Sequence, residues 1–144
     1  MATGDRNYDI AKETTLQEIL NRVSDSACGT FKTNSVTKNV YSTSKTYSNV
    51  VTLENSKLIS LQVKGSSGLN INTMIKIDGV TVLQDSYNST GDYFYLTRFN
   101  NGLDIVSGGS ANCIALDLEG KSITIDMYTT SSNTVTVVVE YIQY

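Results

Sequence analysis

The stretch MIKIDGVTVL, residues 74–83, predicts a tight β-hairpin. Two short runs of apolar and β-branched residues flank Asp78-Gly79, a dipeptide that readily adopts the positive φ angles of a two-residue hairpin turn. We therefore predict antiparallel strands over 74–77 and 80–83. Short alternating runs of this kind, separated by Gly, Asn, Asp and Ser, fill the chain from Thr30 to Tyr144.

Two more hairpins are predicted on the C-terminal side of this stretch. Alternation over 92–98 and 103–107, with a turn at 100–102, predicts one, with Tyr93, Tyr95 and Thr97 on one face and Phe94, Leu96 and Arg98 on the other. Runs over 114–118 and 123–127, joined at Glu119-Gly120-Lys121, predict the other. The last run, 134–144, is apolar on both faces and free of proline, so we expect it to be central or covered by a neighbouring subunit.

On the N-terminal side, the runs 36–41 and 47–53 are rich in Thr, Ser and Asn and predict edge strands or an extended arm. The run 58–64 predicts a half-buried strand with Ile59, Leu61 and Val63 facing the core. Eight or nine short strands with no helices between them favour a mainly β fold, an antiparallel β-sandwich or jelly roll, and exclude a parallel α/β fold.

One segment has helical periodicity instead. Leu16, Ile19, Leu20 and Val23 recur at the spacing of one helical face. Thr15 and Glu18 form a capping box, so we predict a helix over 15–24. About three turns of helix are marginal in water, so this apolar stripe must be buried against something. We therefore divide the chain into an anchoring or oligomerisation segment, 1–29, and a β-sandwich domain, 30–144.

The composition is that of a folded domain without a nucleic-acid partner. The 144 residues are 40% hydrophobic and 17% charged, with a net charge of −3, which gives no basic field for phosphates. No apolar run is long enough to span a membrane, and the first 30 residues lack the pattern of a secretory signal. We expect a soluble product of the cytoplasm, with no membrane partner.

The absence of histidine excludes Ser-His-Asp and Cys-His relays. Asp104, Asp117 and Asp126 could in principle serve as the two carboxylates of a glycosidase, but each alternates with apolar neighbours as a solvent-facing strand residue does. We expect no catalytic residues and no enzyme activity. We also expect no cofactor.

No metal site is expected either. Asp85, Asn88 and Asp92 offer oxygen ligands without the spacing of a calcium loop, so we interpret them as a polar turn. Cys28 and Cys113 lie far apart in the chain and outside any zinc pattern. Without an export signal, we expect two free thiols rather than a disulfide.

The chain contains nine tyrosines and no tryptophan. Tyr87, Tyr93 and Tyr95 could form a platform on which a sugar ring stacks, or could line a sandwich face or a subunit interface, where tyrosine is enriched. We favour the interface, because sugar-binding modules usually rely on tryptophan. A carbohydrate- or receptor-binding sandwich that contacts a host surface glycan is the alternative function.

The segment Tyr8–Val23, with its sequence AKETTLQEIL at 11–20, resembles the opening of small structural proteins of tailed bacteriophages. These begin with such a helix and continue into a β-rich body. The resemblance implies a virion protein, a head fibre, capsid decoration or tail attachment, assembled in the host cytoplasm with other virion proteins. The rest of the chain resembles such proteins only in its Ser/Thr/Asn-rich, proline-free composition.

A lone amphipathic helix before a β domain needs a partner surface. Three copies of the stripe Leu16, Ile19, Leu20 and Val23 meeting on one axis would supply it, so we expect a homotrimer with these residues as the assembly interface. The alternative is that the helix folds onto its own sandwich.

Overall fold

The computed structural model describes residues 29–99, 102–107 and 116–144. The predicted helix over 15–24, with its stripe Leu16, Ile19, Leu20 and Val23, lies outside these residues, as do Cys28 and Cys113. The described strands are β1 (Thr30–Asn39), β2 (Ser48–Gly65), β3 (Asn70–Ile77), β4 (Val80–Asn88), β5 (Tyr93–Phe99), β6 (Gly102–Ser107), β7 (Leu118–Thr129) and β8 (Thr134–Gln143). No helix in the described part of the chain is long and apolar enough to cross a membrane.

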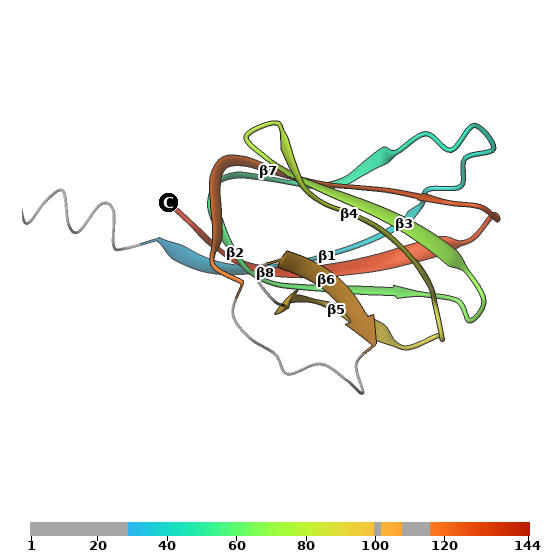
Figure 1. Cartoon of the computed structure of the whole chain (residues 1–144). Helices are drawn as coiled ribbons and strands as arrows, with labels where there is room; N and C mark the ends of the chain where they lie inside the picture. The colour runs from blue at the N-terminus through green and yellow to red at the C-terminus, as the bar shows by residue number, and fades with distance from the viewer. Residues whose placement is uncertain (1–28, 100–101, 108–115) are drawn as a thin grey trace, which may run out of the picture. The chain divides into compact units, whose positions relative to one another are not determined.

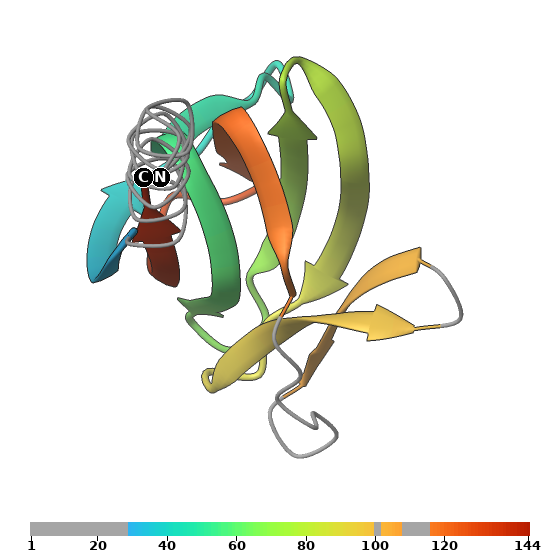
Figure 2. The ribbon, with the colours of Figure 1, turned by 90° about the vertical axis from the view of Figure 1, so that its left-hand side faces the viewer.

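The eight strands form one antiparallel sheet in the order β1-β8-β2-β7-β3-β4, with the hairpin β5-β6 joined to β2. The long strand β2 bends and belongs to two layers, as Figure 1 shows. Its first part pairs with β7, whereas its last part pairs with β8 on one edge and β5 on the other. The two layers, β7-β3-β4 and β1-β8 with β5-β6, are seen from the end of the strands in Figure 2. The mainly β sandwich predicted from the sequence is confirmed.

The core lies between these layers and is built by alternation along the strands. On β7, Ile123, Ile125 and Met127 are fully buried, and on β8 Val135, Val137 and Val139 are buried in the same way. Every second side chain of a strand points to the same face, so each strand gives one row to the core and one to the outside. β8 lies between β1 and β2, which confirms that the last run is central.

The predicted hairpin at 74–83 is confirmed as the junction of β3 and β4. Asp78 and Gly79 have φ angles of 50° and 82°, the positive values that the two-residue turn requires. The turn also contacts β7, because the Asp78 amide donates to the Ser122 carbonyl (2.8 Å) and the Ser122 amide donates to Asp78 Oδ1 (2.9 Å). The predicted pairing of 92–98 with 103–107 is confirmed by the register of β5 and β6.

The third predicted hairpin, with a turn at Glu119-Gly120-Lys121, is wrong. β7 runs through these residues without a turn, because Glu119 and Gly120 pair with Lys57 and Ser56 of β2. Gly120 is required for a different reason: a β-carbon there would lie 2.6 Å from Ile77 Cγ2. The glycine therefore permits a close approach of β7 to the β3-β4 turn.

The predicted core face of 58–64 is wrong at one residue. Leu61 and Val63 are buried, but Leu58 is the buried residue at the start of this run and Ile59 is only half-buried. The register between β2 and β8 shifts between Leu58 and Ser60, which indicates a bulge at Ile59. Such an irregularity has no sequence signal here, so strict alternation predicted the wrong residue.

The polar run 36–41 lies largely in β1, which forms one end of the sheet. Nine of the ten residues of β1 are exposed, and Val36 alone is half-buried against the core. The prediction of an edge strand is confirmed for 36–41. It is wrong for 47–53, which lies mostly in β2, an interior strand of the sheet, and buries Val50, Val51 and Leu53. Lys32 and Lys38 on β1 are side chains of the kind that keep an edge strand soluble.

Candidate binding surface

The structure separates the three tyrosines of the predicted platform. Tyr87 on β4 packs against the core, and its ring lies 4.8 Å from that of Phe94 at an angle of 32°. Burial raises the pKa of Tyr87 well above its usual value. Tyr93 and Tyr95 flank the buried Phe94 on β5, so their side chains point to the opposite, outer face. The structure thus brings Tyr93 and Tyr95 together on one face and does not bring Tyr87 to them.

Tyr95 belongs to a row of side chains that crosses four strands. It pairs with Val106 of β6 on one side and with Gln62 of β2 on the other, and Gln62 pairs in turn with Val138 of β8. Directly paired residues of an antiparallel sheet point to the same face. Three of the four side chains in this row are apolar or aromatic, and all four are half-buried. We call Val106, Tyr95, Gln62 and Val138 the middle row.

Tyr93 begins a second row, in which Lys64 of β2 and Thr136 of β8 follow. The Lys64 Nζ atom lies 5.3 Å from the centroid of the Tyr93 ring, within the range of a cation–π contact. Thr136 continues the row to β1, because its hydroxyl lies 3.0 Å from that of Thr37. We call Tyr93, Lys64 and Thr136 the lysine row.

An open hollow adjoins the lysine row. Its volume is about 240 Å³, and its lining comes from the end of β2, the turn before β5 and the start of β8. The lining residues are Lys64, Gly65, Ser66, Gly91, Thr134 and Thr136. It therefore presents one cation and several hydroxyl groups next to the ring of Tyr93.

A carboxylate occupies the other side of the middle row. Glu140 of β8 pairs with Ser60 of β2, and the Ser60 hydroxyl donates a hydrogen bond to Glu140 Oε2 (2.7 Å). We call Ser60 and Glu140 the glutamate row. Lys64 and Ser60 are four residues apart on β2, so the two charged rows lie about 13 Å apart with the middle row between them. Among the described residues, Lys57 and Glu119 form an ion pair (3.8 Å). This pair involves neither Lys64 nor Glu140.

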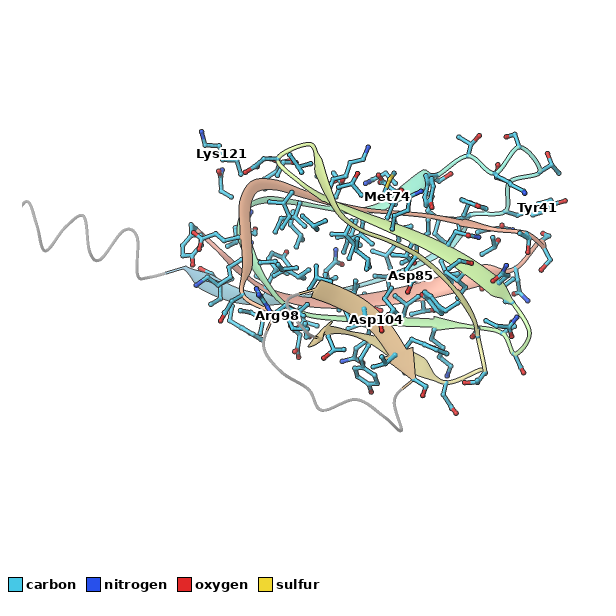
Figure 3. All side chains as sticks on the ribbon, viewed as in Figure 1. Tyr41, Met74, Asp85, Arg98, Asp104 and Lys121 are labelled. Atoms are coloured by element: carbon cyan, nitrogen blue, oxygen red, sulfur yellow. The ribbon has the colours of Figure 1, made fainter. Side chains whose placement is uncertain are left out.

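The outer face of the other layer is different in composition. There Asn49 of β2, Asp126 of β7, Met74 of β3 and Gln84 of β4 form the row that crosses the strands. The Asn49 amide donates to Asp126 Oδ1 (2.9 Å), which holds this row in internal polar contacts. Figure 3 shows Met74 on this side of the molecule and Asp104 on the other. This row contains one apolar side chain, Met74, whereas the middle row contains three apolar or aromatic side chains.

The three candidate carboxylates do not converge. Asp104 is on β6, Asp126 is on the outer face of β7, and Asp117 precedes β7 with a φ of 50°. β6 pairs with β5 alone, whereas β7 lies between β2 and β3. In the part of the chain that the structure describes, no group of three or more Cys, Asp or Glu side chains is placed to hold a metal ion.

Gln62, Lys64, Thr136, Val138 and Glu140 were not predicted as site residues. Alternation puts Gln62 on the face opposite Leu61 and Val63, but the run that holds Thr136, Val138 and Glu140 is apolar on both faces. In addition, the neighbours of all five residues across the sheet depend on the register of β2 with β5 and β8, strands that lie far apart in the sequence. That register is a tertiary property, so local patterns carried no signal for this surface.

Comparison with solved structures finds weak likeness to viral proteins. The crystal structure of the infectious bursal disease virus VP2 subviral particle aligns with a TM-score of 0.33 and 13% identity, covering 79% of this chain and 37% of that chain. The structure of the infectious bursal disease virus Gx strain aligns with a TM-score of 0.32 and 13% identity, covering 80% and 38%. This chain therefore spans little more than a third of the length of those chains.

No protein-family model matches the chain, and no curated protein matches it.

Proposed function

We propose that this chain is a non-enzymatic structural protein of a virion, of the tailed-bacteriophage type, that assembles with copies of itself and with other virion proteins. The single observation that supports an assembly role is the outer face formed by the middle row and its two flanking rows. Its middle row has one tyrosine, two valines and no charge, and Lys64, Glu140 and Asp104 of β6 supply charge around that row. Aromatic enrichment and few charges are typical of the centre of protein interfaces.

The N-terminal segment supports the virion part of the proposal. Its sequence resembles the opening helix of phage structural proteins, and its stripe Leu16, Ile19, Leu20 and Val23 needs a partner surface. In this proposal the helix holds copies together, as a trimer, and the sandwich faces outward as a head fibre, capsid decoration or tail component. The virion is then the site of function, after assembly in the host cytoplasm.

The test replaces Ile19 and Leu20 together by Asp in the full chain, which puts charges into the proposed helix contact. We expect the double variant to keep the β-rich circular dichroism and the cooperative melt of the wild type but to lose its oligomeric mass in light scattering. If the variant instead unfolds, the helix belongs to the sandwich core. A normal melt together with an unchanged mass contradicts the assembly role of the stripe.

A second candidate function is carbohydrate binding, which the hollow beside the lysine row favours. Its hydroxyl groups and the nearby Tyr93 ring are the groups that contact sugars: hydrogen-bonding partners and a stacking surface. A glycan array with wild-type protein and with Tyr93→Ala tests it. Binding that Tyr93→Ala abolishes supports this function, and the absence of binding to any glycan contradicts it.

A further inference from the structure

The outer face of β8, β2 and β5 has charges arranged so that it can match itself. Lys64 lies on one side of the middle row and Glu140 lies on the other, while the middle row has no charge. When two sheets pack face to face, a two-fold axis can lie in the plane between them. If this axis runs along the middle row, rotation places the lysine row of one copy over the glutamate row of the other.

The same rotation places each side chain of the middle row over its own counterpart. Tyr95 and Val138 then pack against the same residues of the second copy, which is the isologous arrangement of a two-fold interface. Sheets that pack in this way lie about 10 Å apart, a distance that Lys and Glu side chains span together. Lys64 of one copy then lies over Ser60 of the other, one strand or about 4.8 Å to the side of Glu140, so the contact contains an apolar centre and two identical diagonal Lys64–Glu140 pairs.

We propose that this face binds a second copy of the chain across a two-fold axis along Val106, Tyr95, Gln62 and Val138. The proposal rests on the structural role proposed above, but it uses a surface separate from the N-terminal helix. If the helix forms trimers, the sheet face joins one trimer to another. The outer face of the other layer remains outside the contact, because its polar groups form hydrogen bonds with one another. Asn49 donates to Asp126, and Gln84 donates to the Tyr47 hydroxyl.

The charge arrangement makes a direct test possible. Lys64→Glu places two glutamates opposite each other in each charged contact, and Glu140→Lys places two lysines there. Each variant alone should raise the dissociation constant of the two-fold contact by about tenfold or more, because like charges at an interface repel. An equal mixture of the two variants restores opposite charges at both contacts in a mixed dimer.

Sedimentation equilibrium of the full chain over a concentration series measures these constants. We expect the mixture to recover affinity to within about threefold of the wild type, and the recovery to weaken at about 1 M salt, where charge interactions are screened. Circular dichroism melts of each variant establish that the fold is retained. Lys76→Glu on the outer face of β3 is the matched control, with the same change in charge and no expected change in affinity.

Three results overturn the proposal. The first is a wild type that shows no concentration-dependent association through this face. The others are single variants with the wild-type dissociation constant, and a mixture with a dissociation constant no lower than that of either variant alone. The same measurements in the Ile19→Asp/Leu20→Asp background separate this contact from the helix. If mixing Lys64→Glu with Glu140→Lys restores affinity in that background, the result supports the sheet contact independently of the helix. Loss of mass in the helix variant, with no effect of the charge variants, overturns the sheet contact and leaves the helix role standing.

Discussion

Ile77 and Gly120 are in contact so close that a β-carbon added to Gly120 would lie 2.6 Å from Ile77 Cγ2. This relationship fixes the distance between β7 and the turn that joins β3 to β4. The same turn makes two hydrogen bonds with Ser122, so Gly120 and Ser122 form the surface on which the hairpin rests.

Replacing Gly120 by Ala should therefore destabilise the sandwich. Because Ile77 and the turn would have to move, we expect a loss of about 1–3 kcal/mol in the free energy of unfolding, the usual cost of overpacking. Urea denaturation followed by circular dichroism measures it. Glu119→Ala is the control: its side chain is 58% exposed and its ion pair with Lys57 is a surface pair worth about 1 kcal/mol at most. Equal stability of the two variants would show that the close approach relaxes without cost.

Asp78 has a second role besides its position in the turn. Its carboxylate accepts a hydrogen bond from the Ser122 amide (2.9 Å), which ties the hairpin to β7. Asp78→Ala should lower the free energy of unfolding by about 1 kcal/mol, and Asp78→Asn, which keeps an acceptor and tolerates the positive φ, by less. Thermal melts of both variants test this order. A reversed order would mean that the side-chain hydrogen bond contributes nothing.

The core prediction concerns Ile125, which is fully buried on β7. It pairs with Val51 of β2 on one side and Ile75 of β3 on the other, so its truncation leaves a cavity in the β7-β3 layer. Ile125→Ala should cost about 2–5 kcal/mol. The neighbouring Thr124 points to the outer face, and Thr124→Ala should change stability by about 0.5 kcal/mol or less. Comparable losses for the two variants in denaturant titrations would contradict the assignment of faces on β7.

Tyr87 gives the prediction about pH. Burial raises its pKa above the ordinary value of 10.0, because the ionised phenolate would lose its hydration. Below about pH 10 the phenol is neutral in both states and its contribution to stability is complete. As the pH rises further, the unfolded chain releases this proton before the folded chain does, so stability falls.

Tyr87→Phe removes that proton while keeping the ring against Phe94. The variant should therefore lose less stability than the wild type between about pH 8 and about pH 11, measured by urea midpoints at the two pH values. Tyr95→Phe is the control, because Tyr95 lies on the outer face. If Tyr87→Phe loses as much stability as the wild type between these two pH values, the Tyr87 phenol ionises as easily in the folded protein as in the unfolded chain.

Local sequence determined much of the fold. Asp78-Gly79 specified a hairpin, alternation placed Phe94 and Leu96 together on one face of their strand, and the apolar character of 134–144 required a strand that is central or covered by a neighbouring subunit. These features can be predicted from the sequence because each depends on backbone preferences and side-chain burial within about ten residues. The same reasoning placed Tyr93 and Tyr95 on the opposite face, and burial in the folded sandwich decided which of the two faces is the inner one.

Tertiary structure decided the rest. Gly120 has the sequence signature of a turn, but the pairing of β7 with β2 and the approach of Ile77 make it part of a continuous strand. Tyr87 is close to Tyr93 in the sequence, yet Tyr87 packs inward from β4 against Phe94, whereas Tyr93 lies on the outer face of β5. Lys64, Tyr95, Val138 and Glu140 share one face only because β2 pairs with both β5 and β8. Such register is set by long-range burial of the opposite, apolar rows, and no local pattern encodes it.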